Sequence, residues 1–390
     1  MKALLVTGRL AKEVVQRYAN QAKVETVVLD LPVAVAALLT PEFIAQQLKT
    51  MDLTRFDVVL VPGLIRGDIT LVERSCGVSA FKGPKYAADI PIVLSNLGEM
   101  KLSKTVPADE VLQESLRTQV LSELYERESE RESLLQRLGN FLVGNVPVGR
   151  DFPMRVMAEI LDAPTLSDQQ IRYQSSYYVR SGAQIIDVGM MAGEPKPEDS
   201  ARVVEAVKRE VDVPVAIDTF DLNEAKAAVE AGADMLLSLD TSTIDEAVVF
   251  ARDTAVVVLP GDHKCSYFPK ETSARVKALA LSVAKAKDLG YKKVIADPIL
   301  DPLNMPGLTE SLASYRAYSQ EYPDVPLLFG AGNITELLDA DSIGVNALLA
   351  GLASEIGVSI LLTTEGSDKT QGAVRELSVG AKMMFVAKRR

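Results

Sequence analysis

Aspartates end several short apolar runs in the second half of this chain, at regular intervals. The runs are AQIID, VPVAID, DMLLSLD, VVVLPGD and KVIAD, and they end in Asp187, Asp218, Asp240, Asp262 and Asp297. Carboxylates gathered at one site can bind a divalent metal, exchange protons, or accept the paired N–H donors of a 2-amino-4-oxo-pyrimidine. A single aspartate after a strand is more often a helix N-cap. Five in register favour a functional site, and the residues alone leave the three chemistries open.

One repeating unit positions these aspartates. From about Met154 onward, a β-branched run, a polar or glycine-rich turn and an amphipathic helix recur eight times. The predicted strands cover 155–160, 184–188, 213–217, 234–239, 255–259, 293–297, 326–330 and 359–363. Eight such units predict an α/β fold, a (β/α)8 TIM barrel, in which the carboxyl ends of the strands build the active site. We therefore expect the aspartates to gather on that rim.

Residues 1–107 predict a separate, small Rossmann-like α/β domain. Its predicted strands cover 2–8, 24–31 and 57–63, and its predicted helices cover 10–21 and 41–50. The loops TGR and PGLIRGD follow two of these strands and are candidate binding edges. The chain has no G-x-G-x-x-G and no phosphate-loop pattern, so a nucleotide site is not assigned.

A helical linker and lead-in are predicted over 108–153, ahead of a barrel domain at 154–390. The charged segment 108–139 carries a leucine stripe, which predicts one or two helices packed between the domains or across a homodimer. The segment that follows is rich in Gly, Pro and Val, and it predicts an irregular stretch covering the bottom of the barrel.

The composition excludes several classes of function. The chain of 390 residues has a formal net charge of -11, which argues against nucleic acid as a partner. Cys76 and Cys265 lie far apart and form no metal-binding motif, so we expect no disulfide and a cytoplasmic location. The sole histidine, His263, excludes a histidine-rich zinc site. No signal peptide, membrane span or membrane partner is expected.

Four motifs of the barrel resemble a known family. GAQIIDVGMMAGEPKP, VPVAIDTFDLNEAKAAVEAGADMLLSLD, KVIADP and GAVRE are similar to the pterin-binding domain of dihydropteroate synthase and of corrinoid-linked methyltetrahydrofolate methyltransferases, over roughly residues 154–385. TGRLAKEVV, LTPEFIA, LVPGLIRGD and VGRDFPMRV look like the dihydropteroate synthase-related proteins of archaea and methylotrophs. The resemblance implies a reduced pterin of the tetrahydromethanopterin kind as substrate or cofactor.

The resemblance also implies roles for single residues. Asp187 matches the aspartate that closes strand two, and Asp218 and Asp297 match the pair that reads the pterin. Asp240 lies near the strand-four asparagine of the family, with an offset, and is a further pterin candidate. Arg375 matches the strand-eight arginine that holds the leaving pyrophosphate, although the partner histidine of that motif is missing.

The chain departs from the synthases at two strand ends. The first strand ends in EILDAPTLSD, with Glu159 and Asp162 in place of the synthases' asparagine loop. The turn GAGNIT, with Asn333, replaces the lysine motif of strand seven and is similar to the methyltransferase turn whose asparagine faces the reactive nitrogen. Mg²⁺ is a candidate cofactor with Asp162 as a candidate ligand, because an acidic rim repels pyrophosphate without a cation.

The loop after the fifth barrel strand adds further rim candidates. It reads GDHKCSYF and contains Asp262, His263 and Lys264. His263 is a candidate catalytic residue beside Arg375 and Asn333, with a local hydrogen-bonding role as the alternative. Lys264 is a candidate contact for phosphate, and a solvated loop lysine is its default role.

Three functions remain open. The first is a dihydropteroate synthase-like condensation of a 6-hydroxymethyl-dihydropterin pyrophosphate with an arylamine, which the resemblance implies to be a ribofuranosyl-aminobenzene phosphate. The second is a pterin-dependent methyl or one-carbon transferase, with a corrinoid protein as partner. The third is a non-catalytic pterin carrier.

Overall fold

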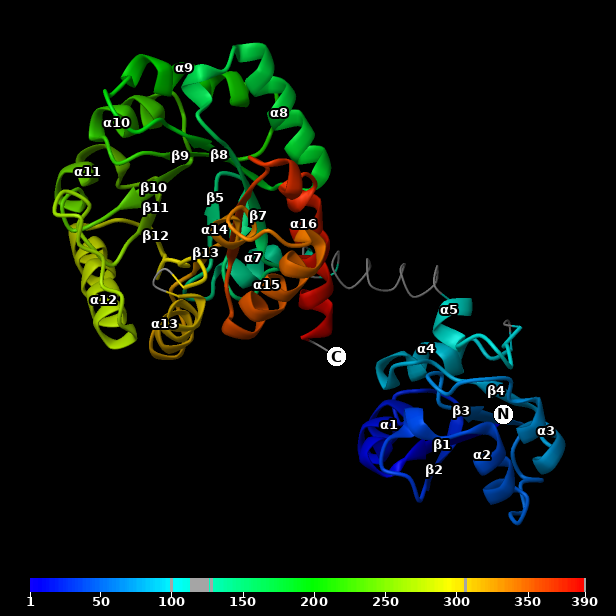
Figure 1. Cartoon of the computed structure of the whole chain (residues 1–390). Coiled ribbons are helices and arrows are strands. Elements are labelled where there is room, and N and C mark those ends of the chain that lie inside the picture. Colours follow the sequence, from blue (N-terminus) through cyan, green and yellow to red (C-terminus); the bar gives the residue numbers. More distant parts are fainter. Residues whose placement is uncertain (99–100, 113–125, 127–128, 305–306, 389–390) are drawn as a thin grey trace. The chain divides into compact units, whose positions relative to one another are not determined.

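The computed structural model describes residues 1–98, 101–112, 126, 129–304 and 307–388. The chain forms two units, Met1–Tyr125 and Glu126–Arg389 (Figure 1). Residues 113–125 and 127–128, which make up much of the predicted connecting helix, lie outside the described residues. The described parts of that segment contain two short helices, α5 (Ala108–Val111) and α7 (Arg131–Leu135). The predicted linker limits, 108–153, remain a prediction.

The first unit is an α/β domain, as predicted. Its parallel sheet has the order β2-β1-β3-β4, with β1 (Lys2–Gly8), β2 (Glu25–Leu31), β3 (Val58–Val61) and β4 (Ala80–Lys82). The short strand β4 was not predicted. Helices α2 (Pro41–Leu48) and α3 (Thr70–Cys76) share an apolar cluster with one face of the sheet, and α1 (Lys12–Ala19) and α4 (Ile90–Ser95) share one with the other. Helices on both faces explain why β1, apart from Lys2 at its start, and β3 are buried along their length.

A β-hairpin covers the bottom of the barrel, where an irregular segment was predicted. Its strands are β5 (Phe141–Val143) and β6 (Val146–Val148), and Val143 and Val148 pack into the cluster inside the barrel. Gly144 begins the two-residue turn with a φ of +52°, a conformation that glycine adopts at little cost. The Gly144-Asn145 pair was the signal for this hairpin in the sequence.

The second unit is the predicted barrel. Its strands are β7 (Arg155–Ile160), β8 (Ile185–Gly189), β9 (Val215–Asp218), β10 (Met235–Leu239), β11 (Ala255–Val258), β12 (Lys293–Ala296), β13 (Leu328–Gly330) and β14 (Ile360–Thr364). Their order is β12-β11-β10-β9-β8-β7-β14-β13, all pairs are parallel, and a bridge between Ala296 and Leu327 joins the two ends. The predicted strands are confirmed to within two residues at each end.

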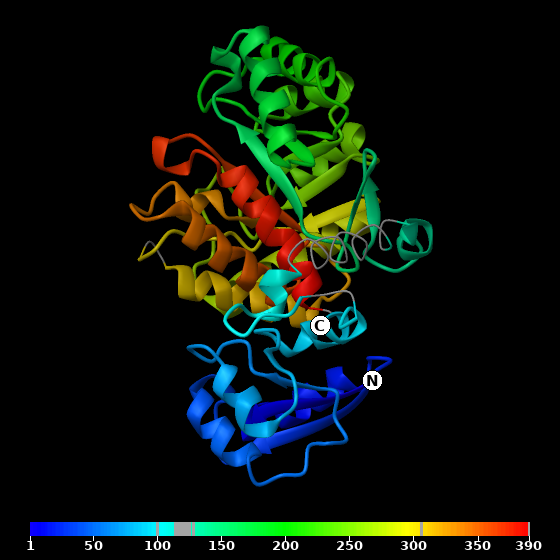
Figure 2. The ribbon, with the colours of Figure 1, turned by 90° about the vertical axis from the view of Figure 1, so that its right-hand side faces the viewer.

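Helices surround the strands on the outside (Figures 1 and 2). They are α8 (Asp168–Ser181), α9 (Pro197–Lys208), α10 (Leu222–Glu230), α11 (Ile244–Ala251), α12 (Thr272–Leu289), α13 (Leu308–Glu321), α14 (Gly332–Thr335), α15 (Ser342–Ile356) and α16 (Ala373–Ala387). Alternate strand residues form two cores, one inside the barrel and one between strands and helices. Among the described residues, no helix has both the length and the apolar character of a membrane span.

Candidate functional site

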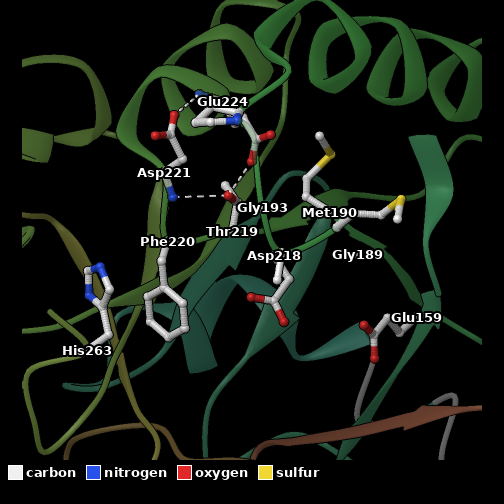
Figure 3. Close-up of a pocket in the computed structure, with 13 residues that line it drawn as sticks. Glu159, Gly189, Met190, Gly193, Asp218, Thr219, Phe220, Asp221, Glu224 and His263 are labelled. Carbon is white, nitrogen blue, oxygen red and sulfur yellow. Dashed lines mark hydrogen bonds between the residues drawn. The ribbon is translucent and has the colours of Figure 1, made fainter. Parts of the chain in front are cut away.

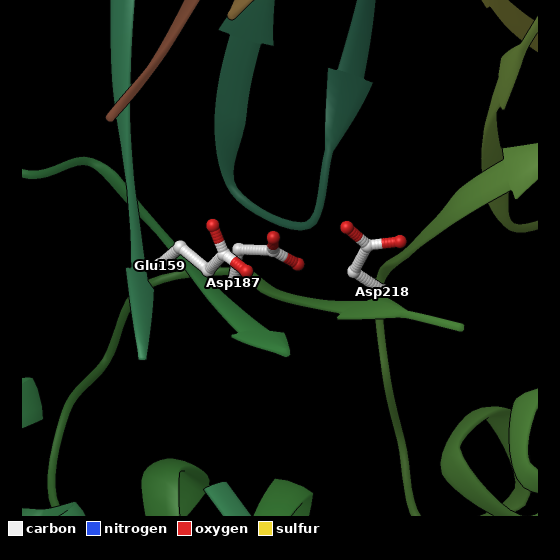
Figure 4. Close-up of side chains that lie close together, drawn as sticks. All are labelled: Glu159, Asp187 and Asp218. Carbon is white, nitrogen blue, oxygen red and sulfur yellow. The ribbon is translucent and has the colours of Figure 1, made fainter. Parts of the chain in front are cut away.

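Three carboxylates from neighbouring strands meet inside the barrel. In the register of the sheet, Glu159 pairs with Asp187, and Asp187 pairs with Ala216, two residues before Asp218. Alternate residues of a strand share a face, and the residues two positions before these three acids belong to the interior cluster: Met157, Ile185 and Ala216. One carboxylate oxygen from each of Glu159, Asp187 and Asp218 lies within 4.8 Å of the other two (Figure 4). We call these three residues the carboxylate cluster.

Asp187 occupies the middle of the cluster. Figure 4 shows its carboxylate between those of Glu159 and Asp218. The side chain is fully buried, at 0% exposure, and neither of its carboxylate oxygens has a hydrogen-bond partner in the described part of the chain. A buried polar group without a partner costs roughly 1–3 kcal/mol, and more when charged. Asp187 is therefore suited to a ligand that supplies a cation or N–H donors.

Burial raises the pKa of all three groups, and neighbouring carboxylates add to the rise for Glu159 and Asp187. Burial raises the pKa of Glu159 to about 7, with further contributions from the charges of Asp218 and Asp162. Burial also raises the pKa of Asp218 to about 6. The pKa of Asp187 lies well above its usual range, through burial first and then through the charges of Asp218 and Glu159. The cluster therefore retains protons at a pH where isolated carboxyl groups are ionised.

Glu159 and Asp218 line a cavity of about 480 Å³ (Figure 3). Its apolar walls include Met190 and Met191 after β8 and Phe220 after β9. Small-molecule sites are typically about 300–1,000 Å³, so the cavity has room for a bicyclic heterocycle with a substituent. The described lining residues include no Lys or Arg, and His263 is the one among them that can become positively charged.

Two further acids of the cavity wall support the local structure. Asp221 caps α10, because its Oδ1 accepts hydrogen bonds from the backbone N–H groups of Asn223 and Glu224 at 2.9 and 3.0 Å. Glu224 accepts from the backbone N–H of Lys196 at 2.8 Å and from the Thr219 hydroxyl at 2.5 Å. These bonds tie the loops after β8 and β9 together beside the cavity.

Asp297 faces the same rim from β12 but does not line this cavity. Its Oδ1 accepts a hydrogen bond from the Tyr315 hydroxyl at 2.6 Å and one from the Ile299 N–H at 2.7 Å. Burial raises the pKa of Asp297 to about 6 against these bonds, and the charge of Asp218 adds to the rise. The charge of Asp218 therefore reaches Asp297, and a shared ligand for the two remains a prediction.

Asp240 is fully buried and holds the loop after β11 in place. Its Oδ2 accepts from the His263 N–H at 2.6 Å and lies 2.8 Å from His263 Nδ1, and its Oδ1 accepts from Ser242. Burial acts to raise the pKa of Asp240, but these hydrogen bonds outweigh it and the pKa lies below its usual range. The His263 ring stacks on Phe220, with centroids 4.5 Å apart. Asp240 thus positions an aromatic pair at the cavity.

The expected position of Arg375 requires a correction. The eighth strand is β14, whereas Arg375 lies exposed in the first turn of α16, so it does not match a strand-eight arginine. The motif comparison placed a helical segment on a strand. Asn333 is exposed in α14, and its Nδ2 donates to the carbonyl of Leu300 at 2.9 Å.

Three other rim candidates lie in loops. Asp162 is exposed in a left-handed conformation with a φ of +47°. Asp262 accepts a hydrogen bond from the Cys265 N–H at 3.2 Å, and exposed Lys264 donates to the Ser242 carbonyl at 3.4 Å. Roles of these residues in binding remain predictions.

Sequence reasoning missed two aromatic residues at the rim. Phe220 directly follows the strand-ending IDT segment, and this position was the signal that could have found it. Tyr315 is fully buried on α13 and gave no separate signal, because a helical tyrosine is usually a core residue.

The family described as "Pterin binding enzyme" matches residues 162–339, and a family of unknown function matches residues 1–85. An uncharacterized protein of Methanocaldococcus jannaschii is 39% identical over 404 residues, which cover 100% of this chain and 75% of that protein. A dihydropteroate synthase of Clostridium beijerinckii is 30% identical over 139 residues, which cover 31% of this chain and 49% of the relative.

The barrel is also similar to solved structures. The Yersinia pestis dihydropteroate synthase with a pterine-sulfa conjugate has a TM-score of 0.51 at 15% identity, covering 64% of this chain and 100% of that one. The Coxiella burnetii enzyme in complex with pteroic acid has a TM-score of 0.50 at 19% identity. The match covers 64% of this chain and 98% of that one. These likenesses show the fold. The chain belongs to the family of the M. jannaschii protein and is a dihydropteroate synthase-related protein with an extra N-terminal domain.

Proposed function

We propose that the barrel binds a reduced pterin and condenses a 6-hydroxymethyl-dihydropterin pyrophosphate with an arylamine, in folate- or tetrahydromethanopterin-type biosynthesis. The observation that supports this most is the set of inward-facing carboxylates, one of them without a hydrogen-bond donor, in a barrel that matches pterin-binding enzymes. Resemblance to the archaeal and methylotroph proteins favours a ribofuranosyl-aminobenzene phosphate as the arylamine.

The pterin edge complements these acids. A 2-amino-4-oxo-pyrimidine presents an exocyclic amine and a ring N–H side by side, and one carboxylate oxygen can accept from each of them. We assign this recognition to Asp218 and Asp297. The Oδ1 of Asp297 already accepts two hydrogen bonds, so its Oδ2 is the oxygen for the ligand.

The condensation exchanges one bond for another. The bond between the pterin methylene carbon and the pyrophosphate oxygen breaks, and its electron pair leaves with pyrophosphate. The arylamine nitrogen forms the new C–N bond and loses a proton, for which His263, oriented by Asp240, is the candidate acceptor. Mg²⁺, when bound, would neutralise charge on the leaving pyrophosphate.

The test is direct. The purified full chain, given the dihydropterin pyrophosphate, the arylamine phosphate and Mg²⁺, should release pyrophosphate. No release with this or any other arylamine would contradict a synthase.

One observation favours a second function, pterin-dependent methyl transfer. No described Lys or Arg lines the cavity, and a methyl donor, unlike a pyrophosphate ester, needs no cation for its leaving group. Transfer from methyl-tetrahydromethanopterin to cob(I)alamin that is lost in Asn333→Ala would support it. Tight pterin binding without turnover in either assay would instead indicate a carrier.

A further inference from the structure

The cavity is acidic, and no described Lys or Arg in its lining balances the charge of its carboxylates. Glu159 and Asp218 line it, with fully buried Asp187 behind them, and no described lining residue is a Lys or Arg. Ionised carboxylates this close repel one another and would repel a phosphorylated substrate. A cation bound from solvent would offset this repulsion, which no described lining Lys or Arg does.

The carboxylate cluster has the composition and spacing of a cation site. Divalent cations such as Mg²⁺, Mn²⁺ and Ca²⁺ take oxygen ligands at roughly 2.0–2.6 Å, so ligands on opposite sides of one ion stand about 4–5 Å apart. The three cluster oxygens lie within 4.8 Å of one another, which fits this span. Each residue comes from a different strand of a closed barrel, and a rigid scaffold is what a preformed site requires.

Asp187 gives a second and independent indication. Its carboxylate is fully buried, lies between two other carboxylates and has no hydrogen-bond partner in the described part of the chain, so it neither caps a helix nor joins loops there. Both of its oxygens remain available for a ligand within the cluster. Asp221 in the same cavity differs from Asp187, because its carboxylate has a structural role as the cap of helix α10.

We propose that Glu159, Asp187 and Asp218 bind one divalent cation of the Mg²⁺ or Mn²⁺ class at the carboxyl ends of β7, β8 and β9. The site replaces the predicted Asp162 as the place for the metal, since Asp162 is exposed on the loop beyond β7. Asp218 would give one oxygen to the cation and keep the other for the pterin. The cation's use in catalysis rests on the proposed function, whereas its binding rests on the cluster alone.

The experiment measures metal binding directly and needs no turnover. Full-length chain freed of metal with a chelator is titrated with Mn²⁺ in about 0.15 M salt, which screens weak surface binding. Loss of the free-Mn²⁺ electron paramagnetic resonance signal reports binding, and Mg²⁺ is added as a competitor. We expect saturable, stoichiometric binding that Mg²⁺ displaces.

The variants Asp187→Asn and Glu159→Gln keep the side-chain shape and remove one charged ligand each. Both should weaken Mn²⁺ binding by about tenfold or more, on the scale of one lost charged interaction. Asp221→Asn is the matched control, since it removes an acid from the same cavity outside the cluster and Asn caps a helix about as well as Asp. It should bind Mn²⁺ as the unaltered chain does.

The proposal is overturned if the unaltered chain binds no Mn²⁺, or if both cluster variants bind as tightly as Asp221→Asn. Circular dichroism checks each fold, and half-buried Glu159→Gln decides the outcome if Asp187→Asn does not fold. Dihydropterin binding to the metal-free chain is measured in parallel. Pterin binding without Mn²⁺ binding would overturn the cation site alone, and Mn²⁺ binding without pterin binding would overturn the proposed function alone.

Discussion

The carboxylate of Glu159 lies against the backbone of Gly189 on the neighbouring strand. A β-carbon at position 189 would come within 2.7 Å of Glu159 Oε1 and 3.3 Å of the Ile160 carbonyl oxygen. Only glycine therefore allows Glu159 its present position beside Asp187 and Asp218. The pairing of β7 with β8 makes the glycine of the IIDVG motif part of the cluster's geometry.

This contact predicts the effect of Gly189→Ala. The flexible end of the Glu159 side chain can move away from a new methyl group, so the fold should persist while the cluster opens. We expect weaker Mn²⁺ and pterin binding with little change in thermal unfolding. Gly351→Ala is the control, since nothing lies within 4 Å of its added β-carbon in helix α15. It should keep ligand affinity and gain up to about 1 kcal/mol of stability from helix propensity. Full affinity in Gly189→Ala would contradict the tight contact.

Asp218→Asn and Asp297→Asn should each weaken dihydropterin binding while leaving the fold intact. An Asn replaces one acceptor oxygen with a donor, which then faces the N–H groups of the pterin. Losing a charged hydrogen bond costs roughly 1.5–3 kcal/mol, or about ten- to a hundredfold in affinity. Fluorescence titration measures it, with Asp221→Asn as the helix-cap control. Unchanged affinity in both variants would refute the pterin assignment.

The free energy of unfolding should fall as the pH rises through the range in which the carboxylate cluster loses its protons. The folded-state pKa is raised to about 7 for Glu159 and to about 6 for Asp218, above the values of roughly 4 expected in the unfolded chain. The folded chain therefore binds more protons between these limits, and its free energy of unfolding decreases with increasing pH. Urea denaturation should give a lower midpoint at pH 8 than at pH 5.

Two comparisons isolate the cause of this pH dependence. Glu159→Gln should reduce the fall, because the amide does not titrate, whereas Asp221→Asn should retain it. A stability that is equally pH-dependent in Glu159→Gln would show that other groups are responsible.

Asp240→Asn should disturb His263 and its ring partner Phe220. In the unaltered chain, Asp240 Oδ2 contacts both the backbone N–H and the ring Nδ1 of His263. The variant replaces this carboxylate with an amide. We expect a destabilisation of about 1–3 kcal/mol, the range for a buried group that loses its partner. The imidazole of the sole histidine is an unambiguous NMR probe, and its nitrogen shifts should show Nδ1 protonated in the unaltered chain and change in the variant. Unchanged shifts would mean that Asp240 does not orient the ring.

Local patterns determined the architecture of this protein. Strand and helix periodicities are properties of short segments, so the barrel strands and most of the N-terminal sheet were predicted to within about two residues. The aspartates at the strand ends were also predicted to share one rim, because parallel strands end together. The hairpin β5–β6 was also detectable, because Gly144-Asn145 is a typical two-residue hairpin turn. We predicted an irregular segment there instead.

Only the tertiary structure decided which rim acids act together. Whether two rim carboxylates meet depends on the register of their strands. It also depends on whether each side chain points into the barrel at the end of its strand. The register of β10 shifts between Leu236 and Leu239, and Asp240 turns to the His263 loop instead of joining the cluster. Glu159, from the first strand, takes a place beside Asp187 through parallel pairing. These relations join residues far apart in the chain, and no short-range pattern contains them.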